Sequence, residues 1–353
     1  MIKKTIIITI TSLLFLSCNS DSETVSSFDI QKLRTDIITN IETPITTSFI
    51  ESIDDLNNSI QIFTTNPNEN NLLVAKNTWK TAAKNYSLIQ VLNIGEIKTS
   101  YIQTSFFSWV ANAKGIEEYL LSNKEISEIA INSISTNLRG LASIEHLLFD
   151  KNTTETIEGF TDIRRKEYLN ILGLNLVSKA TIYNSKWNTF RTKFIENNST
   201  GINGSINQVI NQMYALLEDV KSYKIGQPAG IEKTSVPDIT LLQAQKSDYS
   251  LVLIQNNIES IKNIYFGNEN GIDDFVSSIT KNETLNNKIK IQFETIENTI
   301  SAFGNNSLKE AIINDKANVK KLYNEVKQLL VLIKTDVASV LSVTITFTDN
   351  DGD

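Results

Sequence analysis

The chain has 353 residues and a single cysteine, and its 33 Lys and Arg residues against 40 Asp and Glu residues give a formal net charge of −7. This length supports one large or two ordinary domains, each with a sizeable core. The acidic balance argues against nucleic acid as a partner, and one cysteine excludes an intrachain disulfide or a multi-cysteine metal site.

The N-terminus predicts a lipoprotein export signal. Two lysines precede an apolar run over residues 5–16, which is too short to span a bilayer, and the run ends on a serine followed by Cys18. We therefore expect residues 1–17 to be removed and Cys18 to be lipidated. The polar residues 18–27 would form a flexible tether, and the acyl chains would hold the protein on a membrane.

This signal predicts a lipid-anchored protein of the bacterial cell envelope. We expect the anchor to lie in the outer membrane, and the protein to face either the periplasm or the outside of the cell. The alternative is an ordinary secreted protein that carries an incidental cysteine in its signal.

Apolar residues recur at helical spacing along most of the chain. They step by three and four over residues 30–41, 49–63 and 72–89, and the longest periodic segment covers residues 163–196. The apolar face of that segment is formed by Tyr168, Leu169, Leu176, Ala180, Tyr183, Trp187, Phe190 and Phe194. The four prolines, at positions 44, 67, 228 and 237, fit element boundaries. The sequence predicts an all-α fold.

One predicted helix, within residues 137–149, carries polar groups on an otherwise apolar segment. Its polar or flexible positions are Arg139, Gly140, Ser143, Glu145 and His146. Gly140 would let another backbone approach closely. His146 is the only histidine, and adjacent helical residues point about 100° apart, so Glu145 and His146 do not easily share a metal ion. The segment fits either a structural helix with a buried ion pair or cap, or part of a site.

Other chemistries lack their motifs. A Ser/His/Asp hydrolase needs a glycine-flanked nucleophile elbow, and a nucleotide site needs a Gly-rich phosphate loop. A zinc peptidase needs two histidines four residues apart. None of these patterns occurs in the sequence.

Residues 197–205 are rich in Asn, Ser and Gly and lack apolar periodicity, which predicts a junction between two helical domains, residues 28–200 and 201–353. Two short echoes favour a duplicated unit, in which residues 115–119 recur at 271–275 and residues 86–88 recur at 249–251.

The C-terminal tail departs from the helical pattern. Residues 342–348 alternate between apolar and polar, which predicts a short strand, and the chain ends in the acidic run 349–353. The run from Asp349 to Asp353 resembles a truncated calcium loop without its bidentate Glu, and a solvated acidic tail is the alternative.

Several stretches, taken in order, resemble the imelysin family, whose imelysin-like lipoproteins include an insulin-cleaving membrane peptidase and proteins implicated in bacterial iron uptake. The resemblance rests on Trp79 with Tyr86, residues 115–120, residues 137–149, residues 165–169 with Trp187, residues 226–230, residues 246–251 and the Asp-Gly-Asp end.

The family's Gly-x-His-x-x-Glu motif falls on Gly140, Ala142 and Glu145, so an alanine stands where the family has its histidine. The resemblance implies two four-helix-bundle-like domains with a site at their interface. Ser247 and Ser250 would then line the same cleft as Arg139, Gly140, Ser143, Glu145 and His146, and Glu145 would be the remaining candidate metal ligand.

The function expected from this resemblance is that of an envelope binding lipoprotein in iron or other metal acquisition, which uses an interdomain polar cleft and no chemistry of its own. Its ligand would be iron-related or a peptide, and its cofactor a metal ion. The alternatives are an imelysin-type metallopeptidase, which the replacement of the motif histidine by Ala142 disfavours, and an outer-membrane structural or partner-docking protein.

Overall fold

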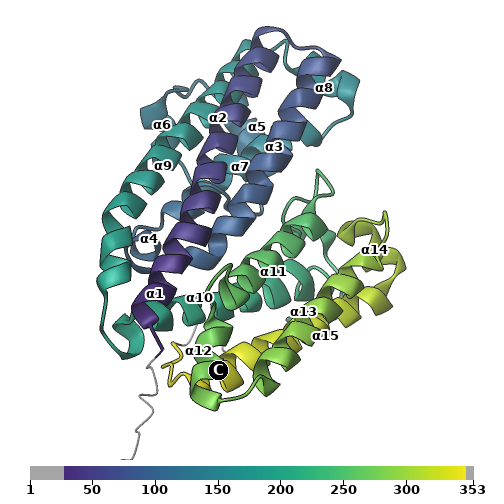
Figure 1. Cartoon of the computed structure of the whole chain (residues 1–353). Coiled ribbons are helices and arrows are strands. Elements are labelled where there is room, and N and C mark those ends of the chain that lie inside the picture. Colours follow the sequence, from purple (N-terminus) through teal and green to yellow (C-terminus); the bar gives the residue numbers. More distant parts are fainter. Residues whose placement is uncertain (1–27, 347–353) are drawn as a thin grey trace, which may run out of the picture.

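The computed structural model describes residues 28–346, and every regular element in this range is a helix (Figure 1). The all-α prediction is therefore confirmed. None of the helices in the described range is long and apolar enough to cross a membrane. The predictions for the export signal, Cys18, the tether and the acidic run 349–353 lie outside the described residues.

The first helix group contains three long rods and several short helices around them. Its elements are α1 (Ile30–Asp36), α2 (Thr43–Thr65), α3 (Glu69–Ile89), α4 (Gly95–Thr99), α5 (Ala113–Leu121), α6 (Glu128–Ser133), α7 (Gly140–Phe149), α8 (Thr153–Gly159) and α9 (Ile163–Glu196). The central helix α2 packs against both α3 and α9. The apolar residues that the periodicity placed inward on these three rods are buried.

The second helix group follows the 197–205 segment. It contains α10 (Ser205–Asp219), α11 (Ser250–Phe266), α12 (Ile272–Thr280), α13 (Thr284–Ser301), α14 (Leu308–Asn314), α15 (Lys316–Val331) and the short α16 (Ala338–Val340). In Figure 1 this group lies below the first, with α10 and α11 nearest to it. Helix α3 packs against α11, and the buried apolar residues of both groups form one continuous core.

Three continuous helical segments, one in the first group and two in the second, contain a wider, π-helical turn. These turns are η1 (Ile37–Glu42) between α1 and α2, η6 (Val220–Gly226) after α10, and η8 (Leu332–Val337) between α15 and α16. Apolar spacing did not reveal them, because a π turn inserts residues without breaking the buried stripe. Pro44 lies in the first turn of α2, directly after η1. The helical rod that begins at Ile30 therefore continues past this proline, where the sequence predicted an element boundary.

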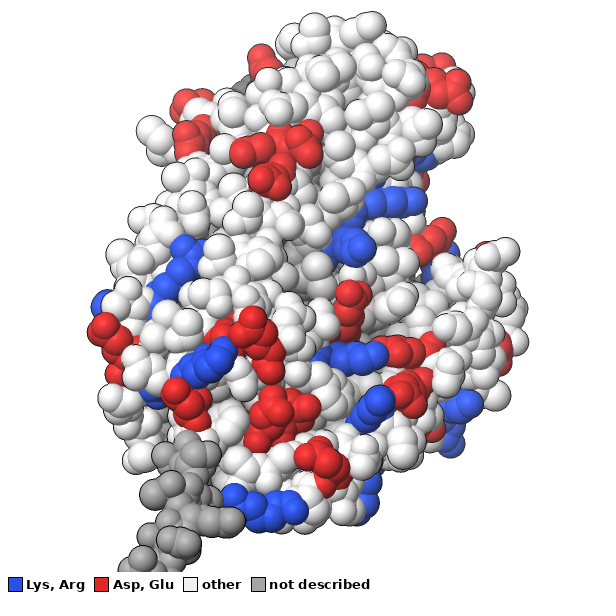
Figure 2. All heavy atoms as spheres, viewed as in Figure 1, with Lys and Arg blue, Asp and Glu red and all other residues white. Residues whose placement is uncertain are grey.

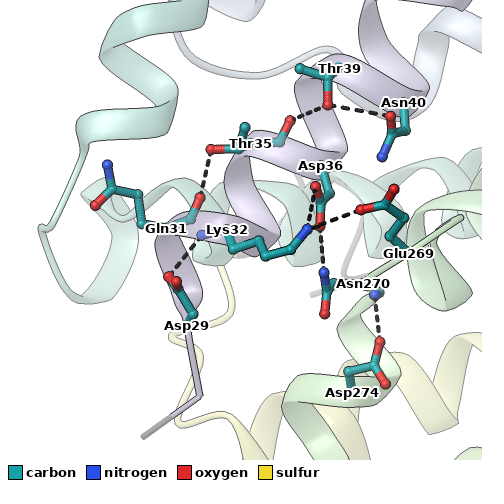
Figure 3. A network of polar contacts seen from close by, with 11 residues as sticks. Asp29, Gln31, Lys32, Thr35, Asp36, Thr39, Asn40, Glu269, Asn270 and Asp274 are labelled. Atoms are coloured by element: carbon teal, nitrogen blue, oxygen red, sulfur yellow. Dashed lines mark hydrogen bonds and ion pairs between the residues drawn. The ribbon is translucent and has the colours of Figure 1, made fainter.

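A polar network ties α1 to the loop that precedes α12 (Figure 3). Lys32 pairs with Asp36 at 2.8 Å and with Glu269 at 3.0 Å, and Asn270 donates its side-chain amide to Asp36. Burial alone would raise the pKa of Asp36, but the hydrogen bonds from Lys32 and Asn270 outweigh it and lower the pKa. This network fixes the start of the first group against the second.

The expected strand does not form in the part of the tail that the structure describes. Residues 343–346 have no regular secondary structure, and side chains of α10 satisfy their backbone groups instead. The Thr344 N–H donates to Asn207 Oδ1 at 2.8 Å, and the Thr346 N–H donates to Asn211 Oδ1 at 2.7 Å. Alternating apolar residues here pack against helices, since no neighbouring strand in residues 28–346 offers a ladder.

Charge is mixed over the surface. On the face shown in Figure 2, Lys and Arg side chains are interspersed with Asp and Glu, and no broad patch of one sign covers either helix group. Many of these charges are paired, as in the contact of Arg191 with the fully buried Glu42 at 2.6 Å.

Candidate functional site

Gly140 begins α7 in a conformation that requires glycine. Its φ is +75°, and a Cβ there would lie 2.6 Å from the carbonyl oxygen of Phe106 and 2.9 Å from that of Ser105. The close backbone approach expected at this glycine is thus present. The Leu141 N–H donates to the Phe106 carbonyl oxygen at 2.7 Å, and Trp79 Nε1 donates to the Leu141 carbonyl oxygen at 2.8 Å. These bonds fix the start of α7.

Glu145, on α7, reaches across to the second helix group. One of its carboxylate oxygens accepts hydrogen bonds from both the backbone N–H and the Oγ of Ser247, each at 2.8 Å. Burial raises the pKa of Glu145 to about 7, against the lowering effect of these bonds and of Lys246. The expected neighbours Glu145 and Ser247 are therefore in contact, and the carboxyl group changes its protonation near neutral pH.

Arg139 and Ser250 do not join this contact. Arg139 Nη1 donates to the carbonyl oxygens of Ile131 and Asn132, at 3.3 and 3.2 Å. Ser250 Oγ donates to the carbonyl oxygen of Gln243. Both side chains have local partners, so of these four residues only Glu145 and Ser247 contact each other.

Ser143 is fully buried, and its Oγ has no hydrogen-bond partner among the described residues.

His146 lines a different pocket, of about 450 Å³, with Glu117, Asp150 and Arg165. Its Nε2 lies 2.9 Å from a carboxylate oxygen of Glu117, and that carboxylate also accepts two bonds from Arg165. Its Nδ1 lies 3.9 Å from Asp150 on the other side of the ring. Burial lowers the pKa of His146 despite Glu117 and Asp150. As predicted, the adjacent Glu145 and His146 face different surroundings.

Within residues 28–346, no group of three or more His, Cys, Asp or Glu side chains is arranged to hold a metal ion. The two carboxylates beside His146 lie on opposite edges of its ring, so one ion cannot contact all three groups. Ala142, which the sequence resemblance aligns with the motif histidine, is 2% exposed and offers no ligand atom.

A buried polar network joins the helix groups at a place that the sequence analysis did not single out. Lys224, in the π turn η6, is 1% exposed, and its Nζ donates to Asn257 Oδ1 at 2.6 Å and to Gln90 Oε1 at 3.2 Å. The Asn257 amide also donates to the Ser87 carbonyl oxygen at 2.8 Å. Burial lowers the pKa of Lys224, and the charge of Asp219 opposes this shift.

Beside this network lies a pocket of about 270 Å³ between the two groups. The first group contributes the end of α3 and the segment 103–109, and the second contributes α10. Its lining residues are Tyr86, Gln90, Asn93, Gln103, Thr104, Phe107, Ser108, Trp109, Gln212, Leu216 and Asp219. The buried Asn93 Oδ1 has no hydrogen-bond partner among the described residues, and burial raises the pKa of Asp219. Oxygen atoms and aromatic rings therefore line one cavity.

A signal for this pocket was present in the sequence. Gln90 continues the apolar stripe of Trp79, Ala83 and Tyr86, and Lys224 continues that of Met213, Leu217 and Val220. A polar residue on a stripe that must be buried needs a buried partner, which marks it as part of a network or site.

Comparison with known proteins gives one family and several solved structures of the same fold. The imelysin family model matches residues 44–333. An imelysin-like protein from Psychrobacter arcticum superposes with a TM-score of 0.76 at 15% identity, covering 90% of this chain and 96% of that one. A proposed iron-regulated protein A precursor from Parabacteroides distasonis superposes with a TM-score of 0.74 at 19% identity, covering 88% and 94%. No curated protein of assigned function matches.

At these identities the two structures show a shared fold, while the family model spans most of the chain and includes α7, the Lys224 network and the pocket beside it. This chain belongs to the imelysin family.

Proposed function

We propose that this chain is an envelope-anchored binding protein that serves metal acquisition, in the first place of iron, and that it binds its ligand in the pocket between the two helix groups. Membership of the imelysin family and the iron-regulated description of one structural relative support the biological role. Anchoring through Cys18 is part of the proposal and rests on the sequence pattern alone.

The observation that carries the binding role is the composition of the pocket. It combines one carboxylate, Asp219, with side chains that carry neutral amide and hydroxyl oxygen atoms. Oxygen ligands of this kind suit hard cations. One carboxylate is too few to hold a bare trivalent ion, so the fitting ligand is a metal ion whose other positions are filled by a small chelating acid.

The location between the helix groups favours binding over catalysis. Pocket residues come from α3 and α10, whose relative position is held by the Lys224 network and by the Glu145 contact. A ligand in this pocket contacts both groups and stabilises their arrangement. The metallopeptidase alternative requires a set of metal ligands that residues 28–346 do not present.

Trp109 provides the readout, because it lines the pocket and is half-buried, whereas Trp79 and Trp187 are fully buried. We would titrate the purified chain with ferric citrate, follow tryptophan fluorescence, and measure bound iron by equilibrium dialysis. We expect saturable quenching that is absent in Trp109→Phe. Loss of the pocket carboxylate in Asp219→Asn should weaken binding about tenfold, the scale of one charged contact.

Asp54→Asn is the matched control, since Asp54 is an exposed residue of α2 remote from the pocket. Citrate without iron tests whether the chelator alone binds. Equal affinities in Asp219→Asn and Asp54→Asn, or no bound iron, would contradict the proposal. Cleavage of insulin by the purified chain, abolished by a chelator, would support the metallopeptidase alternative instead.

A further inference from the structure

A separate pocket, of about 360 Å³, lies where the beginning of the described chain meets its end. Its walls come from α1, from the 198–207 segment that leads into α10, from Phe275 on α12 and from residues 341–343. This pocket shares no lining residue with the one between the helix groups. The proposed metal-chelate function does not involve it.

Arg34 is the charged residue of this pocket, and it is 5% exposed. Its Nη1 donates to the Asn197 carbonyl oxygen and its Nη2 to Asn198 Oδ1 at 2.9 Å, while its Nε has no partner. Both acceptors are neutral. Among the described residues, no carboxylate lies within ion-pair distance of the guanidinium, so a buried cation lacks a counter-charge.

Carboxylates near Arg34 along α1 already have other partners (Figure 3). Asp29 accepts the N–H of Lys32 at 2.9 Å, and Asp36 is bound to Lys32 and Asn270. Burial lowers the pKa of Arg34, and only the charge of Asp29 opposes it. A charged guanidinium that is desolvated in this way gains free energy from an anion that enters the pocket.

The N-terminus of α10 lines the same pocket. Gly204 is its N-cap and provides no capping side chain, and the N–H groups of Ser205, Ile206 and Asn207 have no partner among residues 28–346. The side chain of Asn207 cannot cap the helix, because it binds Thr344. Free N–H groups at the positive end of a helix dipole favour an anion.

Apolar walls complete the pocket. Ile30, Ile206, Leu341 and Val343 line it together with Phe275, whose ring stacks on Phe28 at a centroid distance of 5.0 Å. A ligand that fills the space must therefore present an anionic group next to an apolar part.

We propose that this pocket binds a phosphate ester. The phosphate oxygens would accept from the Arg34 guanidinium and from the N–H groups at the start of α10, and the ester group would lie against the apolar wall. A guanidinium and a helix N-terminus together match the several oxygens of one phosphate. Two sources share this chemistry, the headgroup of a phospholipid and a soluble phosphate ester or ion.

To test this, we would purify the full chain in a nonionic detergent and titrate it calorimetrically with inorganic phosphate and with short-chain phosphatidylglycerol. Diacylglycerol of the same chain length is the lipid control without phosphate. Arg34→Gln removes the guanidinium. Lys290→Gln removes the same charge from an exposed position on α13 and serves as its matched control.

Ser205→Pro is a second variant, which keeps Arg34 and deletes one N–H donor, together with the bond from Ser205 Oγ to the Phe194 carbonyl oxygen. Proline is favoured at the first position of a helix, and the preceding Gly204 has an extended ψ of 139°, which proline accepts. Circular dichroism melts would show whether each variant is folded. If Arg34→Gln does not fold, Ser205→Pro alone decides the outcome.

We expect phosphatidylglycerol and phosphate to bind at one site, with affinity about tenfold or more lower in Arg34→Gln, lower in Ser205→Pro and unchanged in Lys290→Gln. Tighter binding of phosphatidylglycerol than of phosphate identifies a lipid headgroup, and equal affinities identify a soluble phosphate. The proposal is overturned if neither compound binds, if diacylglycerol binds as well as phosphatidylglycerol, or if the folded variants bind like the control.

Discussion

Glu145 should make the stability of the chain depend on pH in a direction opposite to that of a carboxylate whose pKa is lowered on folding, such as Asp36. Its pKa is about 7 in the folded chain against a usual value of 4.5. Below pH 4.5 the group is protonated in both states, so it has no effect. As pH rises towards 7, the unfolded chain releases the proton and the folded chain keeps it, so the free energy of unfolding falls. The full penalty, about 3 kcal/mol, is present above pH 7.

Glu145→Gln removes this penalty, because glutamine stays neutral and its Oε1 can accept the same two bonds from Ser247. We therefore expect the variant to exceed the parent in stability by about 3 kcal/mol at pH 8 and by less than about 1 kcal/mol at pH 5. Urea unfolding followed by circular dichroism at several pH values measures both curves. The difference between the curves isolates Glu145 from other groups that titrate in this range.

Glu294→Gln is the control, since Glu294 is exposed on α13 and its curve should run parallel to that of the parent. A stability difference between Glu145→Gln and the parent that stays constant from pH 5 to pH 8 would refute the reasoning. A variant less stable than the parent at every pH would show that the ionised carboxylate itself holds the helix groups together.

Three further outcomes follow from the structure. Gly140→Ala should lower the free energy of unfolding by about 3 kcal/mol in denaturant melts, because it adds left-handed backbone strain and breaks a hydrogen bond. Gly304→Ala, where a Cβ meets nothing within 4 Å, should cost only about 1 kcal/mol. Equal losses in the two variants would contradict this reasoning. Arg191→Met should lower the free energy of unfolding by about 3 to 5 kcal/mol, because it leaves the Glu42 carboxylate buried without its ion pair. A further Glu42→Gln change should recover much of this stability. A loss below about 1 kcal/mol in Arg191→Met would refute the argument. Cys18→Ser should release the chain from membranes in cell fractionation, and a variant that still pellets after a high-salt wash would show that lipid is not the main attachment.

The helices could be predicted from the sequence where apolar spacing and end signals agree. Residues 163–196 match α9 from end to end, because the apolar stripe runs without interruption and Asp162 caps the first turn. The strand predicted at 342–348 was wrong over the residues described, since alternation shows which side chains are buried but not whether a partner strand exists.

The candidate site was predicted only in part. The contact of Glu145 with Ser247 joins residues 102 positions apart, and it was anticipated only through family resemblance. Glu117, the partner of His146, and Lys224 could not be paired from one sequence, because periodicity shows that a position is buried and not which distant group meets it.

The π turn η6 bears on how this chain is aligned with its relatives. A π turn holds more residues in one revolution than an α-helical turn does, so a relative whose helix is regular at this point has to be aligned with a gap inside the helix. Without that gap, every residue after Val220 would be compared with a neighbour rotated by about 100°. Lys224 lies within this turn, so conservation of its amine can be judged only after the helical phase has been matched in three dimensions.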